Sequence, residues 1–178
     1  DYGPTVGVGS NPLSLDLIDV NSDSLPDIVA LASGSKLVHV IPAQSNGNIG
    51  FVFSTESSPK AVAIADLNGD GFLDQAVVNQ ASNSVSVLTG NGKGMFTLFN
   101  TLITGSSPSH ITIADLNRDG FNDLIVSVQS ANAVQVFMGE EGISREGLSF
   151  EKIENFLIPL SPKPEQIQIT LNLERIIS

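Results

Sequence analysis

Three nine-residue segments of this sequence concentrate side-chain oxygen atoms at a fixed spacing. They are DVNSDSLPD at residues 19–27, DLNGDGFLD at 66–74 and DLNRDGFND at 115–123. Each segment has aspartate, asparagine and aspartate at its first, third and fifth positions, and another aspartate at its ninth. Nine of the eleven aspartates of the chain lie in these segments, so the acidity is concentrated there rather than spread over a solvated surface.

Oxygen donors at alternate positions of a short loop can surround one hard cation. Calcium accepts about six to eight oxygens at roughly 2.3–2.6 Å in flexible geometry, whereas magnesium demands a near-ideal octahedron. Three aspartates, one asparagine and a backbone carbonyl near the seventh position therefore suit calcium. Gly71 and Gly120 at the sixth position permit a sharp turn with positive φ. Ser24 occupies this position in the first segment, and it must either adopt a positive φ or distort the turn.

Two other interpretations of these segments are possible. A helix–loop–helix calcium site begins in the same way, but it needs a glutamate at position 12 and flanking helices. Position 12 is Ala30, Val77 or Val126, inside apolar runs, so this interpretation fails. Asp, Asn and Gly also favour ordinary turns. The recurrence of three copies in register, each with a ninth-position aspartate, favours metal binding over turn chemistry alone.

The sequence around these segments is itself repeated, which indicates how they are positioned. The first aspartates are 47 and 49 residues apart, and a proline lies seven residues before each (Pro12, Pro59 and Pro108). Short runs with alternating apolar residues, separated by Gly- and Asn-rich stretches, predict strands joined by hairpins. In the middle repeat the expected strands span residues 61–66, 74–79, 84–89 and 95–103.

Four short strands in a tandem unit of about 40–50 residues are typical of β-propeller blades. We therefore expect an all-β protein in which residues 1–178 form one domain, with three blades of four antiparallel strands and a partial fourth. The expected repeats span about 10–56, 57–105, 106–160 and 161–178. The ring of blades can be closed in three ways. In the first, the chain is a segment of a larger propeller. In the second, two copies complete one ring, and in the third, residues 2–8 pair with 165–177 in a small four-bladed ring.

The sequence resembles a known family, the FG-GAP or VCBS repeats of integrin alpha-subunit propellers and of many secreted bacterial proteins. The resemblance rests on the proline-to-loop spacing, on the DxNxDGxxD segments and on the hairpin sequence GNGKGMF at 90–96, and it covers about residues 10–170. It implies that each segment is a calcium-binding hairpin between the first two strands of a blade. The implied calcium ligands in each segment are the side chains of the first, third, fifth and ninth residues and the backbone carbonyl of the seventh. They are Asp19, Asn21, Asp23, Leu25 and Asp27; Asp66, Asn68, Asp70, Phe72 and Asp74; and Asp115, Asn117, Asp119, Phe121 and Asp123.

Composition excludes several other functions. A formal net charge of −11 argues against a nucleic-acid partner. No apolar run approaches the length of a membrane span, so we expect no membrane insertion. His39 and His110 fall in expected strands without a nucleophile motif, and the stretch 90–94 lacks the spacing of a phosphate-binding loop. We therefore expect no catalytic residues and no enzyme activity.

The expected function is that of a calcium-binding module for adhesion or for recognition of a protein or glycan. Up to three calcium ions are expected, and dependence on millimolar calcium would place the protein outside the cell, secreted or on the cell surface. Two alternatives remain. The chain is a propeller appendage of a secreted enzyme whose catalytic part lies elsewhere, or it is a structural spacer in a surface assembly. Its expected structural partners are a second copy of itself or a missing propeller segment.

Overall fold

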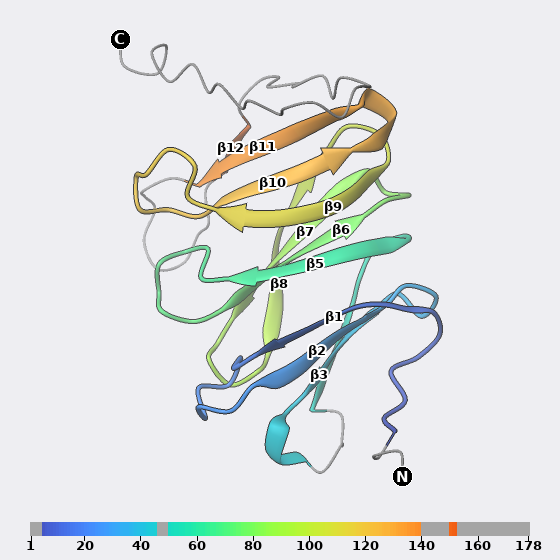
Figure 1. Ribbon diagram of the computed structural model, residues 1–178, viewed down its shortest axis with the longest axis vertical. Helices are drawn as coiled ribbons and strands as arrows, with labels where there is room; N and C mark the ends of the chain where they lie inside the picture. Colours follow the sequence, from blue (N-terminus) through green and yellow to red (C-terminus); the bar gives the residue numbers. More distant parts are fainter. Residues whose placement is uncertain (1–4, 46–49, 140–149, 153–178) are drawn as a thin grey trace, which may run out of the picture.

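The structure, a computed structural model, describes residues 5–45, 50–139 and 150–152 (Figure 1). In these residues the regular structure consists of β-strands and two three-residue 3-10 helices, η1 (Ala43–Ser45) and η2 (Gln129–Ala131). The strands form three antiparallel four-stranded sheets, and the strands of each sheet are adjacent in sequence order. The prediction of an all-β protein built of four-stranded propeller blades is confirmed.

We number the sheets as blades 1 to 3 in chain order. Blade 1 contains β1 (Pro12–Ile18), β2 (Asp27–Ala32), β3 (Leu37–Ile41) and β4 (Phe51–Ser54). Blade 2 contains β5 (Pro59–Ala65), β6 (Asp74–Asn79), β7 (Ser84–Gly90) and β8 (Phe96–Ile103). Blade 3 contains β9 (Pro108–Ala114), β10 (Asp123–Val128), β11 (Ala133–Gly139) and β12 (Phe150–Lys152).

The strands of the middle blade agree closely with the four ranges expected from the sequence. The largest difference lies at the start of β5, which begins at Pro59 instead of residue 61. An irregularity in the register between Pro59 and Ala61 accompanies this longer strand. Proline is compatible with the first residue of a strand, because its missing N–H does not interrupt the hydrogen-bonded ladder there.

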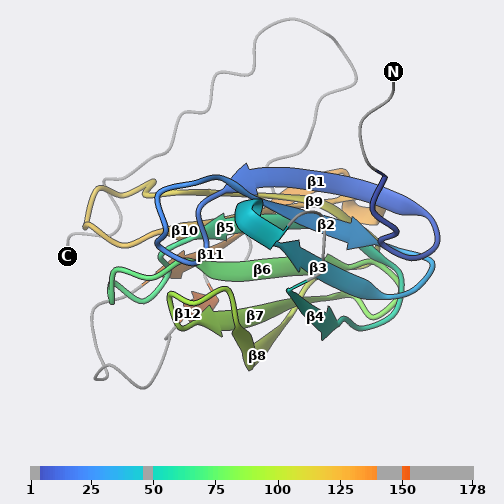
Figure 2. The same ribbon diagram turned by 90° about the horizontal axis from the view of Figure 1, so that it is seen from below.

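The three blades are stacked face to face along the long axis of the molecule (Figure 1). Viewed along the stack, equivalent strands of the blades lie over one another, with β1, β5 and β9 along one edge and β4, β8 and β12 along the other (Figure 2). Contacts between β1 and β5 and between β5 and β9 join the first strands of successive blades. The repeated sequence thus gives a repeated structure, in which contacts join blade 1 to blade 2 and blade 2 to blade 3.

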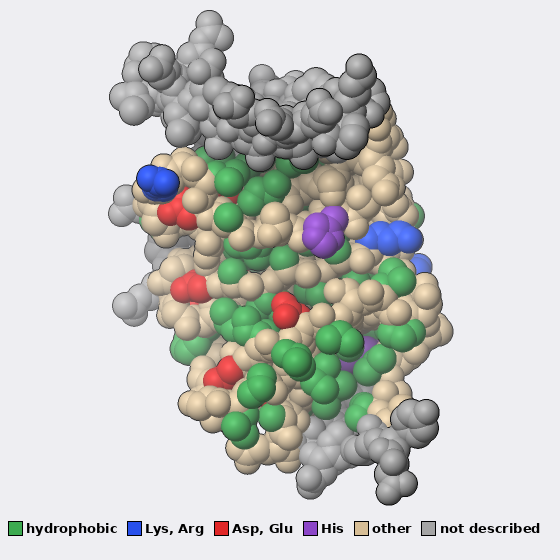
Figure 3. Space-filling view, viewed as in Figure 1, with side chains coloured by type: hydrophobic (Ala, Val, Ile, Leu, Met, Phe, Trp, Pro, Cys, Tyr) green, Lys and Arg blue, Asp and Glu red, His purple; other side chains and the backbone are tan. Residues whose placement is uncertain are grey.

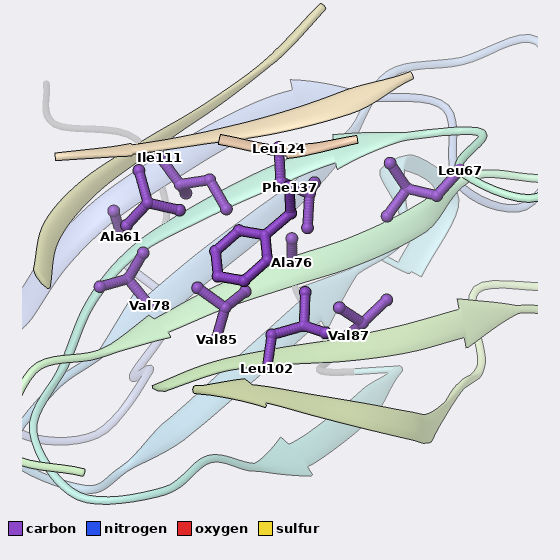
Figure 4. Close-up of a cluster of buried hydrophobic side chains, with 11 residues drawn as sticks. Ala61, Leu67, Ala76, Val78, Val85, Val87, Leu102, Ile111, Leu124 and Phe137 are labelled. Atoms are coloured by element: carbon purple, nitrogen blue, oxygen red, sulfur yellow. The ribbon is translucent and has the colours of Figure 1, made fainter. Parts of the chain in front are cut away.

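The hydrophobic core lies in two layers between the blades. Successive side chains of a strand point to opposite faces of the sheet, so alternate residues of blade 2 pack against blade 1 and blade 3. All six residues of β6 are buried, because both faces of blade 2 are covered. Between blades 2 and 3 lies one cluster, which includes Val78, Val85, Leu124 and Phe137 (Figure 4). The cluster between blades 1 and 2 contains Val29, Leu31, Val38, Val40, Val77, Leu88 and Phe96, together with Val20.

Some sequence expectations fall partly or wholly outside the described residues. The partial fourth repeat, 161–178, lies outside them. In the proposed pairing of residues 2–8 with 165–177, only residues 5–8 are described, and they are not in a strand. The described part of the chain contains no helix that is long and apolar enough to cross a membrane.

Candidate metal-binding loops

The three acidic segments occupy the same position in each blade. They connect β1 to β2, β5 to β6 and β9 to β10, and the ninth residue of each segment begins the second strand. We call them loop 1 (19–27), loop 2 (66–74) and loop 3 (115–123). Because the blades repeat one topology, the loops lie along one edge of the stack, on the left in Figure 1, where Figure 3 shows acidic side chains.

The first aspartate of each loop organises the turn by accepting backbone hydrogen bonds. In loop 2, Asp66 Oδ1 accepts from the N–H of Gly69 at 2.7 Å, and Asp66 Oδ2 accepts from the N–H of Gly71 at 2.9 Å. The third residue continues the pattern, since Asn68 Oδ1 accepts from the N–H of Asp70 at 2.9 Å. Side chains that bond to backbone N–H groups two or more residues ahead stabilise a turn locally.

The other two loops repeat these bonds with different residues. In loop 3, Asp115 accepts from the N–H groups of Arg118 at 2.7 Å and Gly120 at 3.0 Å. In loop 1, Asp19 Oδ2 accepts from the N–H of Ser24 at 2.7 Å. The local sequence therefore determines the loop conformation in all three blades.

The sixth residue of every loop has a positive φ, as the sequence predicted. The angle is 86° at Gly71, 93° at Gly120 and 68° at Ser24. Ser24 thus adopts the positive φ, the first of the two responses expected for it, and carries the steric cost that glycine avoids. The fourth residue of each loop also has a positive φ (Ser22, Gly69 and Arg118).

The ninth aspartate has a structural function that the sequence analysis missed. Asp74 is fully buried, and its two carboxylate oxygens accept N–H groups from Leu67 in loop 2 and from Gly90 at the end of β7, both at 2.9 Å. This carboxylate therefore ties the loop to the third strand of its own blade. A side chain at Gly90 would collide with the carbonyl of Leu73, so glycine permits this close approach. The corresponding donors are Val20 and Ala43 for Asp27, and Leu116 and Gly139 for Asp123.

The loops place carboxylates in contrasting electrostatic surroundings. Burial raises the pKa of Asp74 to about 6, against the lowering effect of its two backbone hydrogen bonds, and the negative charges of Asp70 and Asp66 add to the rise. Burial likewise raises the pKa of Asp123. At Asp19 burial acts in the same direction, but backbone N–H groups, that of Ser24 foremost, outweigh it and lower the pKa.

The donor chemistry of the loops fits a hard cation. Each loop offers only oxygen ligands from carboxylate, amide and backbone carbonyl groups, which are the ligands of calcium. The repulsion of Asp74 by Asp66 and Asp70 is an interaction that a bound cation would reverse. Across residues 5–45, 50–139 and 150–152, no group of three or more Asp, Glu, His or Cys side chains is arranged to hold a metal ion. The loop carboxylates are instead hydrogen-bonded to backbone N–H groups.

Hydrogen bonds also link the loops to neighbouring blades, which the spacing within one repeat does not reveal. Asn122 Nδ2 in loop 3 donates to the backbone carbonyl of Asp66 in loop 2 at 2.8 Å. The hairpin between β7 and β8 reaches loop 1, where the N–H of Gly94 donates to the carbonyl of Val20 at 3.1 Å. The only sequence signal for the first link is an asparagine at the eighth position of loop 3, where loops 1 and 2 have proline and leucine.

The remaining candidate residues are located as the sequence predicted. His39 lies in β3 and His110 in β9. The stretch 90–94 belongs to the hairpin that joins β7 to β8, so its interpretation as a turn rather than a phosphate-binding loop is confirmed. His39 is buried, and its burial lowers its pKa.

Four-stranded antiparallel sheets that are stacked face to face, and that each contain the same loop geometry, define a protein made of β-propeller blades. A family model described as an FG-GAP-like repeat matches residues 19–77 and again residues 66–126. The two matches together span more than half of the chain, and the chain belongs to this family. No curated protein matches the sequence.

Proposed function

We propose that this chain is a non-catalytic, calcium-binding module of an extracellular protein, which recognises a protein or glycan ligand. The observation that carries the proposal is the threefold recurrence of one acidic loop conformation along a single edge of the blade stack. Ordinary turns need neither a fixed set of four oxygen-bearing side chains nor its repetition in three blades. A common cation requirement explains both.

In each loop, the side chains of the first, third, fifth and ninth residues and the carbonyl of the seventh would hold the ion. In loop 2 these are Asp66, Asn68, Asp70, Asp74 and Phe72. Calcium would neutralise carboxylates that now repel one another and would fix the loop edge. Because extracellular calcium is millimolar, even sites with dissociation constants of about 10⁻⁴–10⁻³ M, as in extracellular calcium-binding modules, would be filled there.

The loop edge also has apolar side chains beside its carboxylates. Leu25 and Phe72, at the seventh position of their loops, are 41% and 42% exposed, and Met95 in the β7–β8 hairpin is 46% exposed. Phe72 lies over Gly92 of that hairpin. Aromatic and methionine side chains are enriched at recognition surfaces, which supports this edge as the place where a ligand binds.

Isothermal titration of the 178-residue chain with calcium tests the proposal. We expect saturable binding at up to three sites, and we expect Asp70→Asn to weaken or remove one of them. Asp16→Asn is the matched control, because Asp16 is an exposed aspartate of β1 outside the loops. Absence of calcium binding at millimolar concentration, or equal losses in both variants, would overturn the assignment. A screen of protein and glycan ligands in calcium and in EDTA then tests recognition.

A further inference from the structure

Loop 2 contains an asparagine that is followed directly by glycine. Asparagine is a chemically labile residue, because the backbone nitrogen of the next residue can attack its side-chain amide and close a succinimide ring. A following glycine favours this attack, since it has no Cβ and rotates freely. The sequence has three Asn–Gly pairs, at residues 46–47, 68–69 and 91–92, and the first lies outside the described residues. The pair at 68–69 occupies the third and fourth positions of loop 2.

The hydrogen bonds of loop 2 surround the Asn68 amide with the groups that ring closure needs. The attacking N–H, that of Gly69, donates to Asp66 Oδ1 at 2.7 Å, so a carboxylate lies within reach of the proton that must leave. The carbonyl oxygen under attack, Asn68 Oδ1, accepts the N–H of Asp70 at 2.9 Å. This donor stabilises the negative charge that develops on that oxygen. The departing nitrogen, Asn68 Nδ2, donates to Asp70 Oδ2 at 3.1 Å.

Water has access to this pair, as hydrolysis of a succinimide requires. Gly69 and Asp70 are both exposed. The space beside Gly69 is open, since a Cβ at this residue would have no atom within 4 Å. A ring formed here would therefore be solvated and would be opened by water.

Loop 3 surrounds the equivalent asparagine in the same way but lacks the glycine. The N–H of Arg118 donates to Asp115 Oδ1 at 2.7 Å, and Asn117 Nδ2 donates to Asp119 Oδ2 at 2.7 Å. The arginine side chain hinders the ring closure that glycine permits. In loop 1, serine follows the third-position asparagine. Loop 2 is therefore the one acidic loop in which these surroundings and a following glycine coincide.

The other described Asn–Gly pair has different surroundings. Asn91 Oδ1 accepts the N–H groups of Lys93 at 2.9 Å and of Met95 at 3.3 Å. In the described part of the chain, however, no carboxylate accepts the N–H of Gly92, and the ring of Phe72 lies against this glycine. We therefore expect slower ring closure at Asn91 than at Asn68, although the two dipeptides are identical.

We propose that Asn68 is a site of spontaneous deamidation, which converts the amide at the third position of loop 2 into a carboxylate. The Gly69 nitrogen bonds to Asn68 Cγ, the Cγ–Nδ2 bond breaks, and the amide leaves as ammonia with the proton of the Gly69 N–H. Water then adds to either carbonyl of the succinimide and opens it. The products are aspartate and isoaspartate, in which the main chain passes through the former side chain and is longer by one methylene.

Either product changes loop 2. Asn68 Nδ2 now donates to Asp70 Oδ2, and a carboxylate at residue 68 has no N–H to offer. It also adds a negative charge beside Asp66 and Asp70, and like charges in one site oppose each other's ionisation. The isoaspartate product in addition alters the spacing of the oxygen atoms along the loop. Deamidation therefore modifies this loop and leaves the equivalent residues of loops 1 and 3 intact.

Incubation of the 178-residue chain in EDTA at neutral pH tests the proposal, because the result does not depend on calcium binding. Peptide mapping by tandem mass spectrometry assigns deamidation to single residues over time. We expect Asn68 to react at least about tenfold faster than Asn117, and faster than Asn91. In urea, where the loop is unfolded, Asn68 and Asn91 should react at similar rates. Equal rates at these two residues in the folded protein would overturn the proposal.

Two substitutions exchange residue types between the loops. Gly69→Ser introduces the residue that loop 1 has at this position, and it should nearly abolish deamidation at Asn68 while Asn91 reacts as before. Arg118→Gly introduces the residue of loop 2, and it should make Asn117 react about as fast as Asn68. Because other loops of this chain contain both residues at that position, we expect normal folding by circular dichroism. An unchanged rate at Asn68 in Gly69→Ser, or at Asn117 in Arg118→Gly, would overturn the proposal.

Calcium should slow the reaction at Asn68, and this expectation alone rests on the proposed function. An ion held by Asp66 and by Asn68 Oδ1 would engage the carboxylate and fix the side chain that must rotate. The incubation is therefore repeated in millimolar calcium, beside the calcium titration of the same protein. Absence of calcium binding in the titration would refute the proposed function and leave the EDTA results standing. Calcium binding to loop 2 with an unchanged rate at Asn68 would refute protection by calcium.

Discussion

Asn122 in loop 3 donates its side-chain N–H to the backbone carbonyl of Asp66 in loop 2 at 2.8 Å, across 56 residues of sequence. Asp66 is also the residue whose carboxylate accepts the N–H groups of Gly69 and Gly71. One residue of loop 2 thus takes part both in the conformation of its own loop and in the contact with the next blade. Loops 2 and 3 are thus joined directly, whereas loop 1 is joined to the β7–β8 hairpin of blade 2.

Removal of this link should destabilise the protein without unfolding it. Asn122→Leu introduces the residue type that loop 2 has at its eighth position, and it leaves the Asp66 carbonyl without this donor. We expect the free energy of unfolding to fall by about 1 kcal/mol, the usual net contribution of one hydrogen bond. Urea denaturation measures the change. Asn100→Ala is the control and should change stability by less than about 0.5 kcal/mol, because Asn100 is an exposed residue of β8 whose side chain accepts only the N–H of the adjacent Thr101.

Calcium should stabilise the fold. A site filled at a hundred times its dissociation constant adds about 2.7 kcal/mol to the unfolding free energy, because the cation binds the folded loop and relieves repulsion among its carboxylates. Melting curves in millimolar calcium should therefore lie at clearly higher temperature than curves in EDTA. Magnesium at the same concentration should give a smaller shift. Superimposable curves in calcium and EDTA would contradict the prediction.

Asp74 should give the calcium-free protein a characteristic dependence of stability on pH. Its folded pKa of about 6 lies above the ordinary value of 3.8, so the protonated carboxyl favours the folded state. This contribution is fully present below about pH 3.8 and is lost as the pH rises through about 6. In EDTA, the stability difference between pH 4.5 and 7 should therefore be smaller for Asp74→Asn than for the wild type. Asp16→Asn should retain the wild-type difference, and equal profiles for all three proteins would refute the assignment.

Replacement of Ser24 by glycine should stabilise loop 1. Ser24 has φ 68°, and a residue with a Cβ in this region costs about 1 kcal/mol relative to glycine. We expect Ser24→Gly to raise both the unfolding free energy and the calcium affinity of loop 1, which should otherwise be the weakest of the three loops. Ser14→Gly in β1 is the control, and it should destabilise by about 0.5–1 kcal/mol. A titration in which wild-type loop 1 binds calcium most tightly would contradict this ranking.

The sequence by itself determined the features that depend on local hydrogen bonding and on alternation along a strand. Period-two runs located the strands of the middle blade to within two residues, because side chains in a strand must alternate between faces. The positive φ at Gly71 and Gly120 followed from their position in a nine-residue turn. The loop hydrogen bonds join residues at most seven apart within each loop, so each repeat encodes them.

The tertiary structure decided the features that depend on which residues approach from elsewhere in the chain. The sequence predicts Asp74 as a calcium ligand, and it does not reveal that the carboxylate is buried and accepts the N–H of Gly90, which only the pairing of β6 with β7 brings to it. The Asn122–Asp66 bond likewise exists only because blades 2 and 3 are stacked. Leu15 and Ile111 have the same place in their repeats, but Leu15 is 70% exposed and Ile111 4%. Burial depends on whether a neighbouring sheet is present, and a repeated sequence pattern is the same whether or not that neighbour exists.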